Sequence, residues 1–164
     1  MEPRILHNIP PVYDSRSAVL ILGSFPSVKS RETEFFYGHP RNRFWPLLAA
    51  LRKEEVPLTT AEKKAFLLRN RIALWDVIES CEIHGSSDSS IRGAVPNRVE
   101  RILSAAPITA VFTNGGVSGK LYDKYCLPIT GKEAVKLPST SPANAGASFS
   151  RLLDAWSCIN EYLD

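Results

Sequence analysis

The segment Ala18–Ser27, AVLILGSFPS, indicates the class of fold. Its first five residues form a continuous apolar run, which is typical of a strand covered on both faces in a parallel sheet. A Gly-Ser-Phe-Pro-Ser turn follows at once, and the next helical pattern begins only at Phe44. Connections in compact α/β domains usually take about 2 to 6 residues. The stretch Gly23–Trp45 is therefore predicted to be a functional loop and not a simple connection.

Strands and helices alternate along the rest of the chain. Thr59 and Asn97, each followed three residues later by Glu, are expected to cap helices. A Ser- and Gly-rich stretch at 79–96 is expected to be a second long loop. The alternation predicts an α/β fold with a central, mostly parallel four-stranded sheet and helices on both faces. The expected strands are 18–22, 72–75, 108–113 and 133–137, and the expected helices are 44–51, 59–70, 97–106, 117–125 and 149–163.

Composition favours one domain spanning residues 1–164. The chain is 44% apolar without a break in composition, which is enough for a single buried core. The net charge of +3 and the pI near 8.8 permit an anionic partner without requiring one. The three cysteines match neither a Cys-x-x-Cys metal pair nor a disulfide framework, which favours reduced thiols in the cytoplasm. The first residues lack the apolar core of a signal peptide, and no apolar run approaches the roughly 18 residues of a membrane span.

Polar and turn-forming residues follow each predicted strand. Because the carboxyl ends of parallel strands meet at one edge, and ligands of such sheets bind there, these residues are expected to form the functional site. The four segments are Gly23–Ser27, Asp76, Asn114–Gly116 and Pro138–Asn144.

Several familiar chemistries do not fit this edge. The stretch Asn114–Lys120, NGGVSGK, resembles a phosphate loop but lacks its first glycine and the Ser or Thr that should follow the lysine. Ser118 has no glycine two residues after it, and no histidine follows it in the chain to complete a hydrolase triad. A metal site would need His7, His39 and His84 to converge, and these are more simply surface or loop histidines. No metal site is predicted.

Four short motifs occur in order along the chain: GSFPS at 23–27, YGHPRNRFW at 37–45, TNG at 113–115 and PSTSPAN at 138–144. Together they resemble the uracil-DNA glycosylase superfamily, most closely its hypoxanthine (deoxyinosine) DNA glycosylase branch and the similar mismatch-specific enzymes. The resemblance implies a three-layer α/β/α sandwich that binds DNA and swings a damaged base into a pocket at the strand ends. It also implies monofunctional hydrolysis of the N-glycosidic bond of hypoxanthine, uracil or xanthine in base-excision repair, with no metal or other cofactor.

Asn42 is the catalytic residue that the resemblance implies. Many superfamily members carry Asp or Asn at the third position of the first motif, where this chain has Phe25, which cannot handle a proton. The branch with this pattern relies instead on the Asn of His-Pro-Arg-Asn, which here is Asn42. A neutral amide is a poor base, so Asn42 is expected to position water and to stabilise charge as the sugar becomes oxocarbenium-like. Asn42 could instead cap the helix that begins near Phe44.

The same motifs supply an expected base pocket. The loop after the fourth strand lacks the histidine that some relatives use to stabilise the departing base. Asn114 and backbone N–H groups near Ser24 and Phe25 would take that part, although Asn114, beside two glycines, could be only a turn residue. One of Phe25, Tyr37 and Phe44 is expected to stack on the flipped base.

Polar side chains of these loops are expected to contact the DNA backbone. Each could instead serve ordinary turn or loop chemistry. Asp76 and Asp88 are the only carboxylates expected near the pocket, and neither is assigned as a general base. The candidate DNA contacts are Ser27, Arg41, Arg43, Ser139, Ser141 and Asn144.

The sequence therefore predicts a monomeric DNA glycosylase whose partner is DNA containing a damaged base. Two alternatives stay open. One is a noncatalytic nucleic-acid- or nucleotide-binding α/β module, in which the asparagines only recognise a ligand. The other is a small-molecule hydrolase that uses Ser118 or Ser139.

Overall fold

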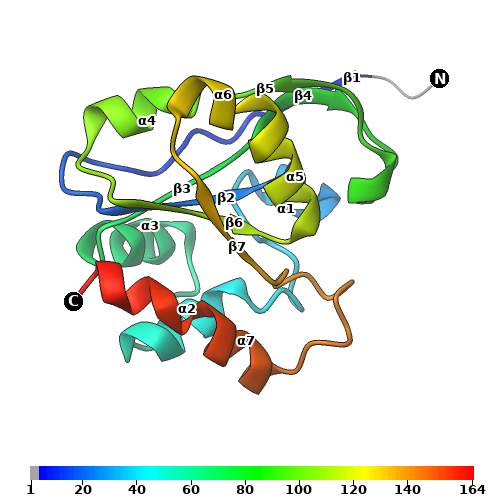
Figure 1. Ribbon diagram of the computed structural model, residues 1–164. Coiled ribbons are helices and arrows are strands. Elements are labelled where there is room, and N and C mark those ends of the chain that lie inside the picture. The colour runs from blue at the N-terminus through cyan, green and yellow to red at the C-terminus, as the bar shows by residue number, and fades with distance from the viewer. Residues whose placement is uncertain (1–3) are drawn as a thin grey trace.

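A four-stranded parallel sheet lies at the centre of the computed structural model, which describes residues 4–164 (Figure 1). Its strands run in the order β3, β2, β6, β7, and each neighbouring pair is parallel. All five residues of β2 are buried, as its apolar run predicted. The strands are β2 (Val19–Gly23), β3 (Ile72–Asp76), β6 (Ala110–Asn114) and β7 (Ala134–Leu137).

Helices cover both faces of this sheet, which confirms the predicted three-layer α/β/α sandwich (Figure 1). Val19 and Ile21 of β2 pack into the core on one face, whereas Leu20 and Leu22 pack into the core on the other. This two-sided burial explains why β2 is apolar throughout. One layer holds α2 (Phe44–Arg52), α3 (Thr60–Arg69), α7 (Phe149–Trp156) and the 3₁₀ segment η2 (Ser157–Tyr162), and the other holds α4 (Glu100–Ala105), α5 (Gly116–Tyr125) and α6 (Leu127–Thr130).

A second, antiparallel sheet occupies the stretch that was predicted to be a long loop. The strand β4 (Ile78–Glu82) pairs with β1 (Arg4–Leu6) on one side and with β5 (Arg92–Pro96) on the other. The prediction of a loop at 79–96 is therefore wrong, although the tip of the hairpin holds only the short 3₁₀ turn η1 (Asp88–Ser90). The Gly and Pro within β5 disfavour a strand locally, so its formation depends on pairing with β4.

Two expected helix caps behave differently. Thr59 caps α3 as predicted, since its Oγ1 accepts from the backbone N–H of Glu62 at 3.1 Å. Asn97 does not cap α4. Its Nδ2 donates instead to the carbonyl oxygens of Asp76, at 2.9 Å, and Ile78, at 3.2 Å. Asn97 thereby stabilises the bend between the end of β3 at Asp76 and the start of β4 at Ile78.

The carboxyl ends of the parallel strands lie at one edge, as predicted. Gly23 pairs with Asp76 across β2 and β3, and Asn114 pairs with Leu137 across β6 and β7. A short helix, α1 (Val28–Thr33), follows β2 at this edge. The loops that leave these strands are therefore neighbours in space.

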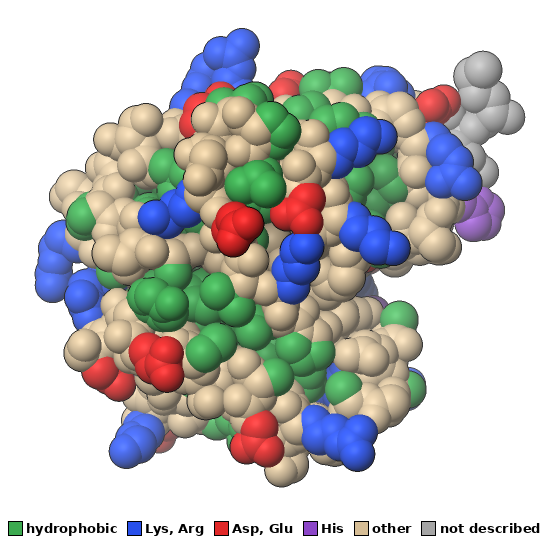
Figure 2. Space-filling view, in the orientation of Figure 1, with side chains coloured by type: hydrophobic (Ala, Val, Ile, Leu, Met, Phe, Trp, Pro, Cys, Tyr) green, Lys and Arg blue, Asp and Glu red, His purple; other side chains and the backbone are tan. Residues whose placement is uncertain are grey.

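The surface carries charges of both signs. On the face shown in Figure 2, Lys and Arg side chains are spread widely and Asp and Glu side chains lie among them. Any contact with DNA on this face would therefore meet individual basic side chains and not one dense basic patch. Within residues 4–164, every helix is too short or too polar to cross a membrane.

Candidate active site

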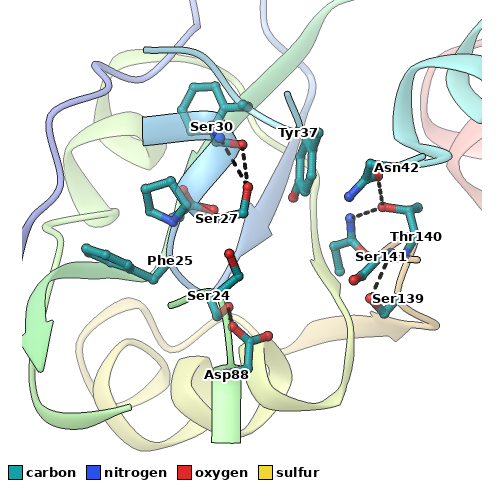
Figure 3. Close-up of a pocket in the computed structure, with 15 residues that line it drawn as sticks. Ser24, Phe25, Ser27, Ser30, Tyr37, Asn42, Asp88, Ser139, Thr140 and Ser141 are labelled. Carbon is teal, nitrogen blue, oxygen red and sulfur yellow. Dashed lines mark hydrogen bonds between the residues drawn. The ribbon is translucent and has the colours of Figure 1, made fainter. Parts of the chain in front are cut away.

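A pocket opens at the carboxyl edge of the parallel sheet (Figure 3). Its volume of about 110 Å³ is well below the roughly 300 Å³ or more of sites for drug-sized ligands, so it suits a small group. The pocket brings together loops that are far apart in the sequence. Eight of the predicted site residues line it: Ser24, Phe25, Ser27, Tyr37, Asn42, Asn114, Ser139 and Ser141.

Thr140 joins the two asparagines of the pocket. Its Oγ1 donates to Asn42 Oδ1 at 2.8 Å and accepts from Asn114 Nδ2 at 3.0 Å (Figure 3). Its backbone N–H donates to Asn114 Oδ1 at 3.0 Å. The backbone N–H of Phe44 donates to Asn42 Oδ1, also at 3.0 Å. Both amide oxygens are therefore occupied.

These contacts decide which end of each amide can serve a ligand. A backbone N–H can only donate, so Phe44 and Thr140 each hold an amide oxygen, which assigns the NH₂ group to the opposite side. In Figure 3 the nitrogen of Asn42 lies on the side of Tyr37. Asn42 lies one residue before the N-cap position of α2, which Arg43 occupies. The Asn42 oxygen meets the first N–H of α2, and Asn42 Nδ2 is a donor at the pocket.

Asp76, at the end of β3, brings a carboxylate to the pocket. Its side chain is only 5% exposed, and its Oδ2 lies 2.8 Å from Nε2 of His7, whose side chain is 2% exposed. His7 Nδ1 accepts from the backbone N–H of Ile9 at 3.2 Å, so Nε2 carries the proton and donates to Asp76. His7 lies in the loop after β1, as one half of the expectation had it, but it is not a surface histidine, because its side chain is buried against a carboxylate that is distant in the sequence.

Asp88 brings a second carboxylate from the hairpin between β4 and β5. Although this tip of the hairpin is exposed, Asp88 lines the pocket and its Oδ1 accepts from Ser24 Oγ at 2.8 Å. Partial burial raises the pKa of Asp88, against the lowering effect of the Ser24 hydrogen bond. The hairpin also reaches α1, since Ser86 Oγ accepts from the backbone N–H of Val28 at 2.9 Å. The unpredicted second sheet therefore contributes to the site.

Tyr37 forms an aromatic wall with Phe44 behind it. The two rings stack with centroids 4.0 Å apart and planes at 22°. Phe44 is 0% exposed and does not line the pocket, so it cannot stack on a base and instead supports Tyr37. The Tyr37 hydroxyl is buried beside Asp76 and Asn114. Burial, and then the charge of Asp76, raise its pKa, so it is a neutral donor.

Gly23 makes room for this arrangement. A Cβ at this position would lie 2.4 Å from Asp76 Oδ1 and 2.8 Å from the Tyr37 hydroxyl, both closer than side-chain carbons come to other atoms. Because Gly23 has no side chain, the Asp76 carboxylate and the Tyr37 hydroxyl can both lie against the end of β2. Tyr37 itself has a φ of 53°, a left-handed conformation that an aromatic residue rarely adopts.

The predicted DNA contacts divide into exposed and internal groups. The Arg43 guanidinium donates to the carbonyl oxygens of Ser141 at 2.9 Å and Asn144 at 3.0 Å, and also to that of Ala147, so it holds the loop after β7 in place. Asn144 Nδ2 donates to the Ser139 carbonyl at 3.0 Å within the same loop, outside the pocket lining. Arg41, in contrast, is exposed.

A family model for the uracil DNA glycosylase superfamily matches residues 10–161 of the sequence. The chain belongs to this superfamily. Membership confirms the resemblance drawn from the four motifs and the expected class of enzyme, a DNA glycosylase.

Two relatives and one solved structure similar to this chain come from Methanosarcina species. A hypoxanthine DNA glycosylase of Methanosarcina barkeri (strain Fusaro / DSM 804) is 35% identical over 144 residues, which cover 87% of this chain and 90% of the relative. Another of that name from Methanosarcina acetivorans is 36% identical over 149 residues, 90% of this chain and 93% of the relative. The solution NMR structure of a candidate uracil DNA glycosylase from M. acetivorans has a TM-score of 0.82 at 32% identity and covers 97% of this chain and 99% of that one.

Sequence reasoning left Thr140 and His7 out of the site. Thr140 lies between two predicted residues of the PSTSPAN motif, and the pattern of the motif does not distinguish its hydroxyl from its neighbours'. The only signal for Thr140 in the sequence is that it is a polar residue between two predicted site residues, Ser139 and Ser141. His7 precedes the first long strand, and only its pairing with Asp76 in three dimensions identifies it.

Proposed function

We propose that this superfamily member is a monofunctional DNA glycosylase that turns a deaminated base out of DNA and hydrolyses its N-glycosidic bond in base-excision repair. Hypoxanthine is the proposed main substrate, with uracil second and xanthine also accepted. The observation that carries the proposal is a base-sized pocket that offers amide donors from Asn42 and Asn114 together with the carboxylate of Asp76. The names of the two Methanosarcina relatives support the choice of hypoxanthine.

A carboxylate beside amide donors suits bases produced by deamination. Adenine N1 and cytosine N3 are acceptors, whereas the corresponding nitrogens of hypoxanthine and uracil carry hydrogen and the adjacent carbonyl oxygen accepts. In the proposed complex, Asp76 accepts from that N–H and an amide or the Tyr37 hydroxyl donates to the carbonyl oxygen. The lone pair of an undamaged adenine or cytosine would face a carboxylate, and sites that leave buried polar groups unpaired reject such ligands strongly.

The proposed hydrolysis uses neutral donors. As the bond to the sugar breaks, negative charge develops on the departing base, and preoriented N–H groups stabilise such charge. Asn114 Nδ2 donates to the departing base in this scheme, which replaces the histidine that the loop after β7 lacks. Asn42 Nδ2 donates to the oxygen of the attacking water, which adds to the sugar C1′ as the N-glycosidic bond breaks. The water gives one proton to solvent, and the departing base anion takes one up. The scheme uses no metal or other cofactor.

A serine hydrolase is the less favoured alternative on the geometry. Ser118 is 1% exposed, and its Oγ donates to the carbonyl oxygen of Gly115 at 2.8 Å, so it is not presented to a substrate. Ser139 Oγ lies in the pocket but accepts from the backbone N–H of Ser141. Labelling by a serine-directed phosphonate would revive this alternative.

The test of the proposed function is cleavage of end-labelled oligonucleotides that each carry one deoxyinosine, deoxyuridine or deoxyxanthosine. We expect strand breaks only after alkali, fastest for deoxyinosine, because a monofunctional enzyme leaves an intact abasic strand. Breaks without alkali would contradict the monofunctional scheme. Salt-dependent DNA binding without any abasic product, with folded protein in excess, would favour the noncatalytic module.

Arg41 and Arg43 should differ in how they affect DNA binding. Log K for DNA binding falls as log salt rises, and one phosphate contact contributes about 0.9 to the steepness of this fall in duplex DNA. We therefore expect the fall to be less steep by about one unit in Arg41→Ala. Arg43→Ala should instead lower the melting temperature, because its guanidinium holds loop carbonyls. Salt titrations and thermal melts of both variants check this. An unchanged slope in Arg41→Ala would remove Arg41 from the interface.

The proposed setting is a reducing cytoplasm, in which one chain acts on one lesion as a monomer. The reducing compartment is supported by three free cysteines, two of which are buried.

A further inference from the structure

Thr140 stands at the junction of the two loops that carry the proposed catalytic and base-binding amides. It is 0% exposed, and all its polar atoms have partners. Its hydroxyl contacts Asn42 and Asn114, and its N–H contacts Asn114. Its carbonyl oxygen accepts at 3.1 Å from the backbone N–H of Arg43, which follows Asn42 in the chain. The loop after β7 and the loop before α2 are therefore joined at this one residue.

The direction of the hydrogen bonds at Thr140 is determined at both ends. Asn114 must present its oxygen to the Thr140 N–H, so its Nδ2 donates to the Thr140 hydroxyl. A hydroxyl has one proton, and Thr140 gives it to Asn42 Oδ1. Asn42 Oδ1 then has two donors, the Thr140 hydroxyl and the Phe44 N–H. These hydrogen bonds hold the side-chain oxygens of Asn42 and Asn114 on the protein side of the pocket. The N–H groups of the two amides are then the atoms that a ligand can contact.

We propose that Thr140 is a positioning residue that makes the pocket present amide N–H groups, from Asn42 and Asn114 together, to the base and the water. The proposal rests on the proposed function, since the two amides it orients are those assigned to catalysis and base binding. Removing the hydroxyl leaves each amide oxygen with one backbone donor and leaves Asn114 Nδ2 without its acceptor. Both amides can then rotate, and one change disturbs two groups at once.

Three variants separate positioning from mere packing. Thr140→Val keeps the shape and removes the hydroxyl, whereas Thr140→Ser keeps the hydroxyl and removes a methyl group. Thr113→Val is the matched control, because Thr113 is also 0% exposed, adjoins Asn114 in the chain, and has a hydroxyl without a hydrogen bond within residues 4–164. A packing effect would follow the methyl group, and a positioning effect would follow the hydroxyl.

The first readout does not depend on activity. Side-chain NH₂ signals of Asn42 and Asn114, assigned in ¹⁵N-labelled protein, should both shift in Thr140→Val and stay near their parental positions in Thr140→Ser and Thr113→Val. Unchanged signals of both asparagines in Thr140→Val would overturn the proposal. This holds even if the parent protein excises no base, a result that would overturn the proposed function instead.

The second readout is single-turnover excision from DNA with one deoxyinosine. We expect Thr140→Val to be at least tenfold slower, in keeping with the loss of oriented donors, while its Kd for DNA changes less than about twofold. Thr140→Ser and Thr113→Val should stay within about threefold of the parental rate. Equal losses in Thr140→Val and Thr140→Ser would assign the effect to packing and would overturn the proposal.

Discussion

Asn42→Ala is expected to slow excision of hypoxanthine by roughly a hundredfold or more, because positioned catalytic groups typically contribute on that order. The substitution removes Nδ2, the donor that the pocket presents, while DNA contacts elsewhere remain. Single-turnover rates with enzyme in excess over a deoxyinosine duplex measure the loss, and a binding titration should show little change in Kd. A rate close to the parental one would remove Asn42 from the mechanism.

Asn42→Asp is the control that separates the pocket from the helix. Aspartate keeps an oxygen for the Phe44 N–H and the Thr140 hydroxyl, so the start of α2 remains satisfied. It replaces the Nδ2 donor by an acceptor. We expect Asn42→Asp to melt close to the parent and to remain slow on deoxyinosine. If the rate returned with the melting temperature, the role of Asn42 would be to cap α2.

Asp76→Asn is expected to lower excision of hypoxanthine by at least about a hundredfold, because sites built on buried hydrogen bonds discriminate strongly when one is lost. His7 Nε2 would still donate to the remaining oxygen, since Nδ1 is held by the Ile9 N–H. The new NH₂ group would then take the place of Oδ1. This NH₂ group is a donor, so it would face the N1–H donor of hypoxanthine without forming a hydrogen bond. It could instead donate to N1 of adenine, which is an acceptor.

The ratio of rates on deoxyinosine and deoxyadenosine measures this change, and it should fall in Asp76→Asn. Asp88→Asn is the matched control, since it removes the same charge from the exposed tip of the hairpin while Ser24 can still donate to the remaining oxygen. We expect it to keep the parental preference for hypoxanthine. Equal effects of the two substitutions would mean that the pocket needs negative charge and not an acceptor at Asp76.

The parallel sheet could be predicted because its signal is local. The run at β2 is apolar throughout, since Val19 and Ile21 enter one core and Leu20 and Leu22 the other. The general location of the site followed as well, because parallel strands end at a common edge. Asn114 could be placed there because it follows a predicted strand, whereas Asn42 could be placed there only through the resemblance of its motif to the superfamily.

The remaining features depend on contacts between distant parts of the chain. Strand β5 contains residues that disfavour strands, and it forms because β4 pairs with it and with β1. Tyr37 and Phe44 are aromatic residues of one motif, and only tertiary packing places one at the pocket and buries the other behind it. The role of Thr140 likewise arises from partners on two separate loops.

The most direct test of the whole scheme is the release of free base from two duplexes that differ only by deoxyinosine or deoxyadenosine at one position. Mass spectrometry of the supernatant and alkali-sensitive breaks in the DNA would be measured on the same samples. We predict free hypoxanthine in amounts equal to the abasic sites, and no release of adenine. Folded, DNA-bound protein that releases neither base, or releases both equally, would contradict a pocket that reads the deaminated edge of the base.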